Sequence, residues 1–267
     1  MKILFLGDVV GNIGTKMIKQ YLPILKRDYK PQLTIVNGEN ATSFGRGINR
    51  KVYKGIMDAG ADVITLGNHA WNNEEIFDFI DETKKLVRPL NFPGKDVPGN
   101  GYTIINVNGK KVAVINLQGR IFMDPIDDPF RMIDELVSKL HSQVDNIFVD
   151  FHAETTSEKQ VMAMYLDGRI SAMVGTHTHV QTNDNRVLKK GTAFMTDAGM
   201  CGPTDGVLGM KYENIIHRFL TQRPTRFEVE ENGGGIVSGC IIDIDNHIMK
   251  AKSIKKILIS PDHPYQG

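Results

Sequence analysis

Cysteine is nearly absent from this sequence, with only Cys201 and Cys240 among 267 residues. The two lie far apart and match no paired-cysteine metal spacing, which argues against a disulfide framework and favours a reducing compartment. Long apolar runs are also missing, since none approaches the ~20 residues of a membrane span. The run Ile3–Leu6 is too short for the core of a signal peptide and ends at Gly7-Asp8. We therefore expect a cytoplasmic protein without a membrane partner.

An excess of charge of either sign is missing as well. The sequence has 32 basic and 31 acidic residues, which gives a formal net charge of +1. This balance is untypical of general nucleic-acid binders and of membrane-surface binders. The apolar content of 41% supplies a sizeable core, and the length suits one large domain. No repeat, low-complexity tract or long linker divides the chain, so we predict a single domain over residues 1–267.

Short apolar runs alternate with amphipathic stretches along the chain. We predict buried strands at Ile3–Leu6, Leu33–Val36, Val63–Leu66, Val112–Leu117, Ile147–Val149 and Ala172–Val174. Apolar residues at helical spacing predict helices around 17–25, 52–59 and 132–140. Gly60 is expected to end the second helix, and Asp128-Pro129 to begin the third. This alternation is typical of an α/β sheet covered by helices.

Some of the strand pairing is predicted to be antiparallel. Asn108-Gly109 separates two β-like runs, which is a strong hairpin signal. Near the C-terminus, Phe227–Glu230, Ile236–Ile244 and Ile254–Ile259 are also β-like. A mixed sheet or a two-sheet sandwich is therefore favoured over a purely parallel sheet.

Polar residues that can bind metal follow five of the predicted strands. They are Asp8, Glu39 in Asn37-Gly38-Glu39-Asn40, Asn68 in Gly67-Asn68-His69, His152, and the pair His177 and His179. Each motif alone has an ordinary structural interpretation, such as a helix cap or a turn. However, ligands of α/β sheets bind at the carboxyl ends of strands, where all of these residues recur. A set of carboxylate, amide and imidazole groups without thiolate suits Mn, Fe or Zn better than Ca.

The order of these motifs resembles the calcineurin-like metallophosphoesterases and, more narrowly, their YmdB-type branch. The resemblance spans nearly the whole chain and rests on Gly7-Asp8-Val9-Val10-Gly11, Asn37-Gly38-Glu39-Asn40-Ala41, Gly67-Asn68-His69, Asn91-Phe92-Pro93, Asn116-Leu117-Gln118-Gly119-Arg120, Asp150-Phe151-His152-Ala153-Glu154 and Gly175-Thr176-His177-Thr178-His179. It implies a metallophosphoesterase-type α/β sandwich with mixed sheets flanked by helices. It also implies a phosphodiesterase that acts on cyclic nucleotides such as 2′,3′-cAMP. The branch is further associated with homo-oligomers and with a regulatory role in bacteria.

The same resemblance implies two divalent or trivalent transition-metal ions, with Fe or Mn favoured over Zn. The superfamily usually has Asp-x-His in its first motif, but Val10 takes the place of the histidine here. Glu39 stands at the position of the bridging carboxylate, and the resemblance implies that Asn40 completes the set. The expected metal ligands are Asp8, Glu39, Asn40, Asn68, His152, His177 and His179.

The expected mechanism uses a hydroxide held between the two ions, which attacks phosphorus. His69 follows the ligand Asn68 without being needed as a ligand itself, so we predict that it is the catalytic acid for the departing ribose oxygen. An orienting role for His69 stays open. Contacts to phosphate also stay open for Arg88, Arg120, Arg169 and Arg186.

Other enzyme classes fit the sequence less well. Amidohydrolases place their His-x-His pair after the first strand of a barrel, whereas His177 and His179 come late and no eightfold repeat of strand and helix is present. Haloacid-dehalogenase-type phosphatases need Asp-x-Asp, and Val10 stands where the second Asp is required. The alternative that stays open is a metal-stabilised regulatory protein, which would act through partner binding rather than turnover.

Overall fold

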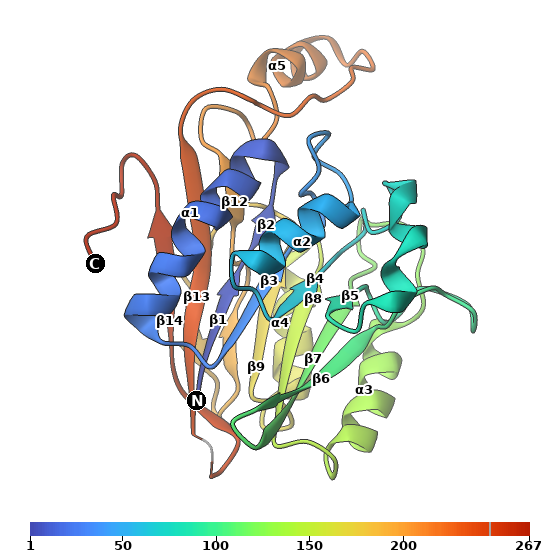
Figure 1. Cartoon of the computed structure of the whole chain (residues 1–267). Coiled ribbons are helices and arrows are strands. Elements are labelled where there is room, and N and C mark those ends of the chain that lie inside the picture. The colour runs from blue at the N-terminus through green and yellow to red at the C-terminus, as the bar shows by residue number, and fades with distance from the viewer. Residues whose placement is uncertain (246) are drawn as a thin grey trace.

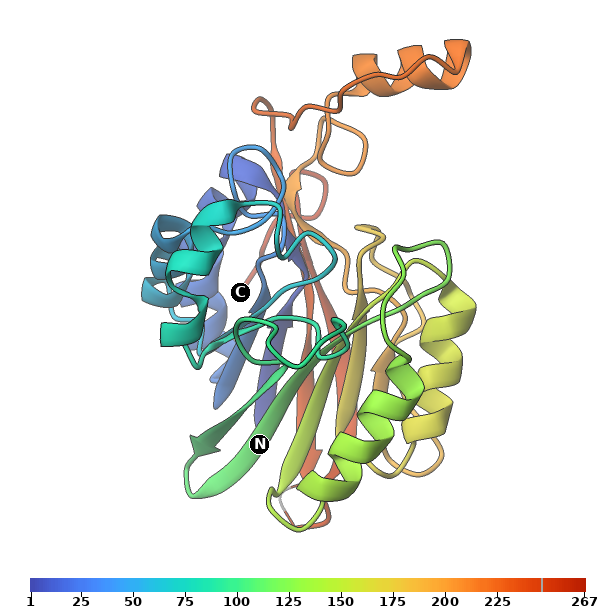
Figure 2. The ribbon, with the colours of Figure 1, turned by 90° about the vertical axis from the view of Figure 1, so that its right-hand side faces the viewer.

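Two β-sheets pack face to face and carry helices on their outer faces (Figures 1 and 2). The computed structural model describes residues 1–245 and 247–267. The larger sheet contains β1 (Lys2–Leu6), β2 (Asp8–Val9), β3 (Leu33–Asn37), β4 (Val63–Thr65), β5 (Leu86–Val87), β12 (Met200–Pro203), β13 (Gly235–Asp245) and β14 (Lys250–Ile259). The smaller sheet contains β6 (Tyr102–Val107), β7 (Lys110–Gln118), β8 (Asn146–His152), β9 (Ala172–Thr176), β10 (Arg186–Val187) and β11 (Ala193–Met195).

Both sheets mix parallel and antiparallel pairs. The larger sheet follows the order β2-β12-β13-β1-β3-β4-β5, with β14 paired to β13, and the smaller one follows β10-β11-β9-β8-β7-β6. Strands β1, β3 and β4 are parallel, and so are β7, β8 and β9. The predicted α/β sandwich with mixed sheets is therefore confirmed.

Helices cover the two outer faces of the sandwich (Figure 2). On the larger sheet these are α1 (Gly11–Tyr29) and α2 (Arg50–Asp58), and on the smaller one α3 (Pro129–Leu140) and α4 (Thr156–Leu166). A further helix, α5 (Tyr212–Thr221), follows β12. Short 3₁₀ helices run over Glu74–Asp78 and Ile80–Glu82. Helix α5 projects away from both sheets and has no buried residue (Figure 1). Among the described residues, no helix is long and apolar enough to cross a membrane.

The apolar core follows the alternation of side chains along each strand. On β1, Ile3 and Phe5 belong to the cluster between the two sheets, whereas Leu4 and Leu6 belong to the cluster under α1 and α2. The rings of Phe5 and Phe148 lie 5.2 Å apart, and this contact joins the larger sheet to the smaller one. A third cluster lies between the smaller sheet and helices α3 and α4.

Most of the turns and helix ends predicted from the sequence are present in the structure. Asn108 and Gly109 have positive φ angles of 52° and 82° and connect β6 to β7. The Asp128 side chain accepts hydrogen bonds from the backbone N–H groups of Phe130 and Arg131 and so begins α3. The predicted strand at Phe227–Glu230 is wrong, since only Val229 forms an isolated bridge there.

We expect the contact between the sheets to dominate stability. Replacing the fully buried Phe148 with Ala should lower the free energy of unfolding by about 3–5 kcal/mol, because it leaves a cavity between two sheets that cannot close up. The matched control is Phe122→Ala, where the ring is 89% exposed and the change should stay within about 0.5 kcal/mol. Chemical denaturation measures both, and similar losses in the two variants would contradict this account of the core.

Candidate functional site

The structure brings all seven predicted ligand residues to one edge of the sandwich. The larger sheet supplies Asp8 on β2, Glu39 and Asn40 after β3, and Asn68 after β4; the smaller sheet supplies His152 at the end of β8, and His177 and His179 after β9. Asp8 accepts a hydrogen bond from the backbone N–H of His177 at 3.1 Å, so the two sets meet. That these residues hold metal ions stays a prediction.

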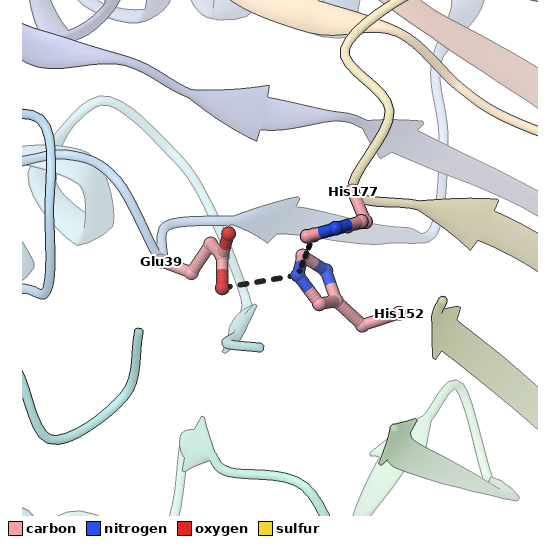
Figure 3. A group of neighbouring side chains, drawn as sticks. All are labelled: Glu39, His152 and His177. Atoms are coloured by element: carbon pink, nitrogen blue, oxygen red, sulfur yellow. Dashed lines mark hydrogen bonds and ion pairs between the residues drawn. The ribbon is translucent and has the colours of Figure 1, made fainter. Parts of the chain in front are cut away.

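His152 is at the centre of the group. Its Nε2 lies 2.8 Å from Asn68 Oδ1, 3.2 Å from Glu39 Oε2 and 3.0 Å from His177 Nδ1. Figure 3 shows Glu39, His152 and His177 pointing toward one another from three separate segments. A second group is formed by Asp8, Glu39 and His179, whose ligand atoms lie within 4.8 Å of one another. Glu39 is the residue that belongs to both groups.

Each of the three histidines has its outer ring nitrogen beside an acceptor. His152 Nδ1 lies 2.9 Å from the hydroxyl of Thr176, His177 Nε2 lies 3.0 Å from Glu154 Oε2, and His179 Nδ1 lies 3.0 Å from the carbonyl oxygen of Leu208. An outer N–H that donates to such an acceptor turns the inner nitrogen toward the group. All three imidazoles thus present their inner nitrogens to the group.

A buried carboxylate below the site ties the two sheets together. Asp150 accepts hydrogen bonds from Asn37 Nδ2 at 2.9 Å and Thr65 Oγ1 at 2.5 Å in the larger sheet, and from Thr176 Oγ1 at 2.7 Å in the smaller one. Since the Thr176 hydroxyl donates to Asp150, it is left to accept from His152 Nδ1. Burial raises the pKa of Asp150 to about 7 despite these donors.

The ligand group contains closely spaced buried charges. Burial opposes the charge of Glu39, but the charge and hydrogen bond of His152 outweigh it and hold the pKa of Glu39 far below its usual range. Burial also opposes the charge of His152, yet Glu39 and Asp8 raise its pKa to about 9. Burial, followed by the charge of His152, lowers the pKa of His177 to about 3. With no metal ion bound, the positive charge beside Glu39 and Asp8 is therefore that of protonated His152.

A metal cation fits the same position. Buried oxygens Asp8 Oδ1 and Asn40 Oδ1 have no hydrogen-bond partner among the described residues. A Cβ at Gly67 would collide with Glu39 Oε2 and His152 Nε2, so the motif needs glycine where the chain passes the ligand group. Carboxylate, amide and imidazole groups are suitable donors for Mn, Fe or Zn. The proton on His152 can be exchanged for the larger charge of a cation, since metal binding releases protons from its ligands.

A cavity of about 450 Å³ opens onto the ligand group. Its polar wall includes Glu39, Asn40, Arg46, His69, Glu154, His177 and His179, and its apolar wall includes Phe44, Val207, Leu208, Met210, Ile215, Phe219 and Phe227. The backbone N–H of His69 donates to Glu39 Oε2 at 3.2 Å, and its Nδ1 lies 3.4 Å from Asn72 Oδ1. Burial lowers the pKa of His69. The ring thus lies in the cavity beside the group.

The four arginines considered from sequence have other contacts. Arg88 donates to backbone carbonyl oxygens, among them those of Pro89 and Pro98, while Arg120, Arg169 and Arg186 pair with Asp128, Asp134 and Asp184, respectively. Arg46, which the sequence analysis did not select, lines the cavity. Sequence reasoning also missed Glu154 and Asp150, although both lie in the motif around His152.

A two-sheet α/β sandwich with carboxylate, amide and imidazole groups at its shared strand ends defines a hydrolase of the metallophosphoesterase class. The model of the YmdB-like protein family matches residues 4–257. A 2′,3′-cyclic-nucleotide 2′-phosphodiesterase from Bacillus subtilis (strain 168) is 56% identical over 265 residues, which cover 99% of each chain. The chain belongs to the YmdB-like family.

Solved structures support this assignment. A phosphatase from Mycoplasma pneumoniae superposes with a TM-score of 0.92 at 37% identity, covering 98% of this chain and 95% of that one. A protein from Thermus thermophilus superposes with a TM-score of 0.90 at 39% identity, covering 97% and 99% of the two chains.

The contacts of the outer ring nitrogens predict opposite tautomers for two histidines. At neutral pH, the metal-free protein should carry the proton of His177 on Nε2, beside Glu154, and that of His179 on Nδ1, beside the Leu208 carbonyl. Long-range ¹H–¹⁵N spectra of histidine-labelled protein distinguish the two forms. Glu154→Ala should weaken the preference at His177 and leave His179 unchanged. The same tautomer at both positions would contradict the orientation described here.

Proposed function

We propose that this chain is a phosphodiesterase that hydrolyses cyclic nucleotides such as 2′,3′-cAMP with the help of two metal ions. One observation carries the proposal: the inner nitrogens of three imidazoles meet two buried carboxylates, and Glu39, His177 and His179 of this group line a cavity. The Bacillus subtilis relative of 56% identity bears the name of that activity. The cavity also has room for a nucleotide, with an apolar wall on which a base can pack.

The residues would hold the ions in two groups that share Glu39. Asn68, His152 and His177 fit one ion, and Asp8, Asn40 and His179 fit the other. We propose Fe or Mn, with Zn as the next candidate, because mixed oxygen and nitrogen donors suit these three metals better than Ca. When bound, the two cations would neutralise phosphate charge and activate water for the attack on phosphorus.

His69 is the proposed proton donor. As water adds to phosphorus, the bond to one ribose oxygen breaks, and that oxygen needs a proton to leave as a hydroxyl. His69 lies in the cavity, with its Nδ1 beside Asn72 Oδ1 and its Nε2 3.5 Å from Asn68 Nδ2, next to the ligand group. Burial lowers the pKa of His69, so the anionic substrate must favour its protonated form. Glu154, which lies beside Nε2 of His177, would position that imidazole as a metal ligand. Arg46, at the cavity wall, would position the phosphate.

The wider expectations follow as parts of the same proposal. We propose a single domain over residues 1–267, a cytoplasmic location, a homo-oligomer and a regulatory role in bacteria. The alternative, a metal-stabilised regulatory protein that acts through partner binding, has one observation in its favour. Helix α5 buries no residue and exposes Phe219 and Leu220 by 74% and 80%. Such a face is typical of a surface that binds another protein.

Changing His69 separates turnover from metal binding. His69→Ala should leave metal content nearly intact, because the ring is outside both ligand groups. Hydrolysis of 2′,3′-cAMP should fall about 10²–10⁴-fold with the loss of the proton donor. A p-nitrophenyl phosphodiester should be affected less, because its leaving group scarcely needs a proton. Steady-state kinetics with both substrates, together with metal analysis by mass spectrometry, give the comparison.

The matched variant is Glu39→Gln, which should lose metal and both activities together because the shared carboxylate is gone. Loss of metal in His69→Ala would show that His69 is a ligand, and unchanged rates on both substrates would place the proton donor elsewhere. A wild-type protein that binds metal but hydrolyses neither substrate would favour the regulatory alternative.

A further inference from the structure

A fully buried ion pair lies behind the histidine turn. Lys159 Nζ on helix α4 is 2.6 Å from Asp197 Oδ2, and both side chains are 0% exposed. Neither residue lines the cavity or belongs to a ligand group. A buried pair of this kind often adds little to stability, since the loss of hydration offsets the attraction between the charges. Its place in the fold suggests another role.

Asp197 binds the residue between the two histidines. Its Oδ2 accepts from the Thr178 backbone N–H at 3.1 Å and from the Thr178 hydroxyl at 2.7 Å. Its Oδ1 accepts from the backbone N–H of Gly199 at 2.9 Å. The carboxylate is thus saturated, and two of its four hydrogen bonds fix Thr178, which lies directly between His177 and His179.

The histidine turn needs such support because its backbone is unusual. His177 and His179 have positive φ angles of 98° and 66°, a region that residues with a side chain seldom adopt. Strained backbone of this kind persists only when surrounding contacts impose it. The hydrogen bonds of Asp197 to Thr178 are contacts of that sort, and they lie between the two strained residues.

Lys159 makes the arrangement possible in the protein interior. Burying a carboxylate is energetically costly unless a cation or hydrogen-bond donors surround it, and Lys159 is the cation beside Asp197. The aliphatic part of Lys159 passes Gly175, where an added Cβ would lie 2.8 Å from Lys159 Cδ and collide with the Thr196 carbonyl oxygen. The glycine that opens the Gly-Thr-His-Thr-His motif therefore makes room first for the Thr196 carbonyl and also for the lysine side chain.

We propose that Asp197, paired with Lys159, is a positioning residue that holds the His177-Thr178-His179 turn in its metal-binding conformation. This inference rests on the proposed metal centre, and it makes Asp197 a residue that helps the centre to retain its ions. The Asp197 carboxylate touches neither substrate nor metal. It acts through Thr178, and its loss should show first as faster release of metal.

The experiment compares two Thr→Val variants of the full chain. Thr178→Val removes the hydroxyl bond to Asp197 but leaves the ion pair in place. The matched control is Thr196→Val, at the position directly before Asp197. It removes a hydrogen bond of the same kind, from the Thr196 hydroxyl to Asp184 at 2.5 Å. Each protein is loaded with Mn²⁺ and exposed to a chelator, and the metal left per chain is followed over time by mass spectrometry. The thermal midpoint of each metal-free protein is measured alongside.

We expect Thr178→Val to release Mn²⁺ several-fold faster than Thr196→Val, with similar midpoints for the two metal-free proteins. Asp197→Asn, where it folds, should weaken Mn²⁺ binding by about 10–100-fold, the usual effect of removing a group that orients metal ligands. Equal release from the two threonine variants would overturn the inference and leave the metal centre standing. A wild-type protein that retains no Mn²⁺ would overturn the metal centre itself, and this inference with it.

Discussion

The rest of the structure depends on one electrostatic constraint, the burial of four carboxylates within a small volume. Asp8, Glu39, Asp150 and Asp197 are each no more than 1% exposed. Ionised groups placed in a protein interior are destabilising unless cations or hydrogen-bond donors surround them. Here Asp150 has three donors, Asp197 has Lys159 and Thr178, and Asp8 and Glu39 have His152 between them. Asp8 Oδ1 and Asn40 Oδ1 lack a hydrogen-bond partner in the described chain, which is the observation behind the proposed metal site.

The same constraint divides the site between the two sheets. The larger sheet contributes oxygen donors, in Asp8, Glu39 and Asn68, and the smaller sheet contributes the three imidazoles. Within residues 1–245 and 247–267, each group of three side chains that could hold an ion draws on both sheets. The distance between the two sets is fixed by the apolar cluster between the sheets, to which Phe5 and Phe148 belong. Packing in the core and geometry at the edge are therefore linked, and Asp150 makes the link directly because its donors come from both sheets.

The sequence predicts the parts of this site that depend on local pattern. Strands followed by Gly-Asp, Gly-Glu-Asn, Gly-Asn-His and His-Thr-His could be recognised because each combines an apolar run with a polar turn, and the family resemblance confirmed by the comparisons rests on the same segments. Asp197 and Lys159 could not be recognised, because single charged residues are common and their contacts cross long stretches of chain. Glu154 stands in the motif around His152, but its contact with His177 becomes visible only in the fold. Phe227–Glu230 was predicted as a strand from its alternating composition, but this segment lies next to the projecting α5, where it finds only the single bridge to Met210.

Helix α4 was not predicted from the sequence, although it carries a residue that supports the site, and both facts have the same cause. The sequence analysis predicted α1, α2 and α3 from apolar residues at helical spacing, but it did not predict α4. The buried residues of α4 include Glu158 and Lys159, so its inward face lacks the apolar pattern that identifies a helix. Both residues have specific partners there. Glu158 accepts from the backbone N–H groups of Arg120 and Ile121, and Lys159 reaches Asp197 behind the histidine turn. Local sequence rules are expected to fail where contacts of a functional site determine the residue types. Helix α4 is such a case, because it buries charged residues behind the ligand group.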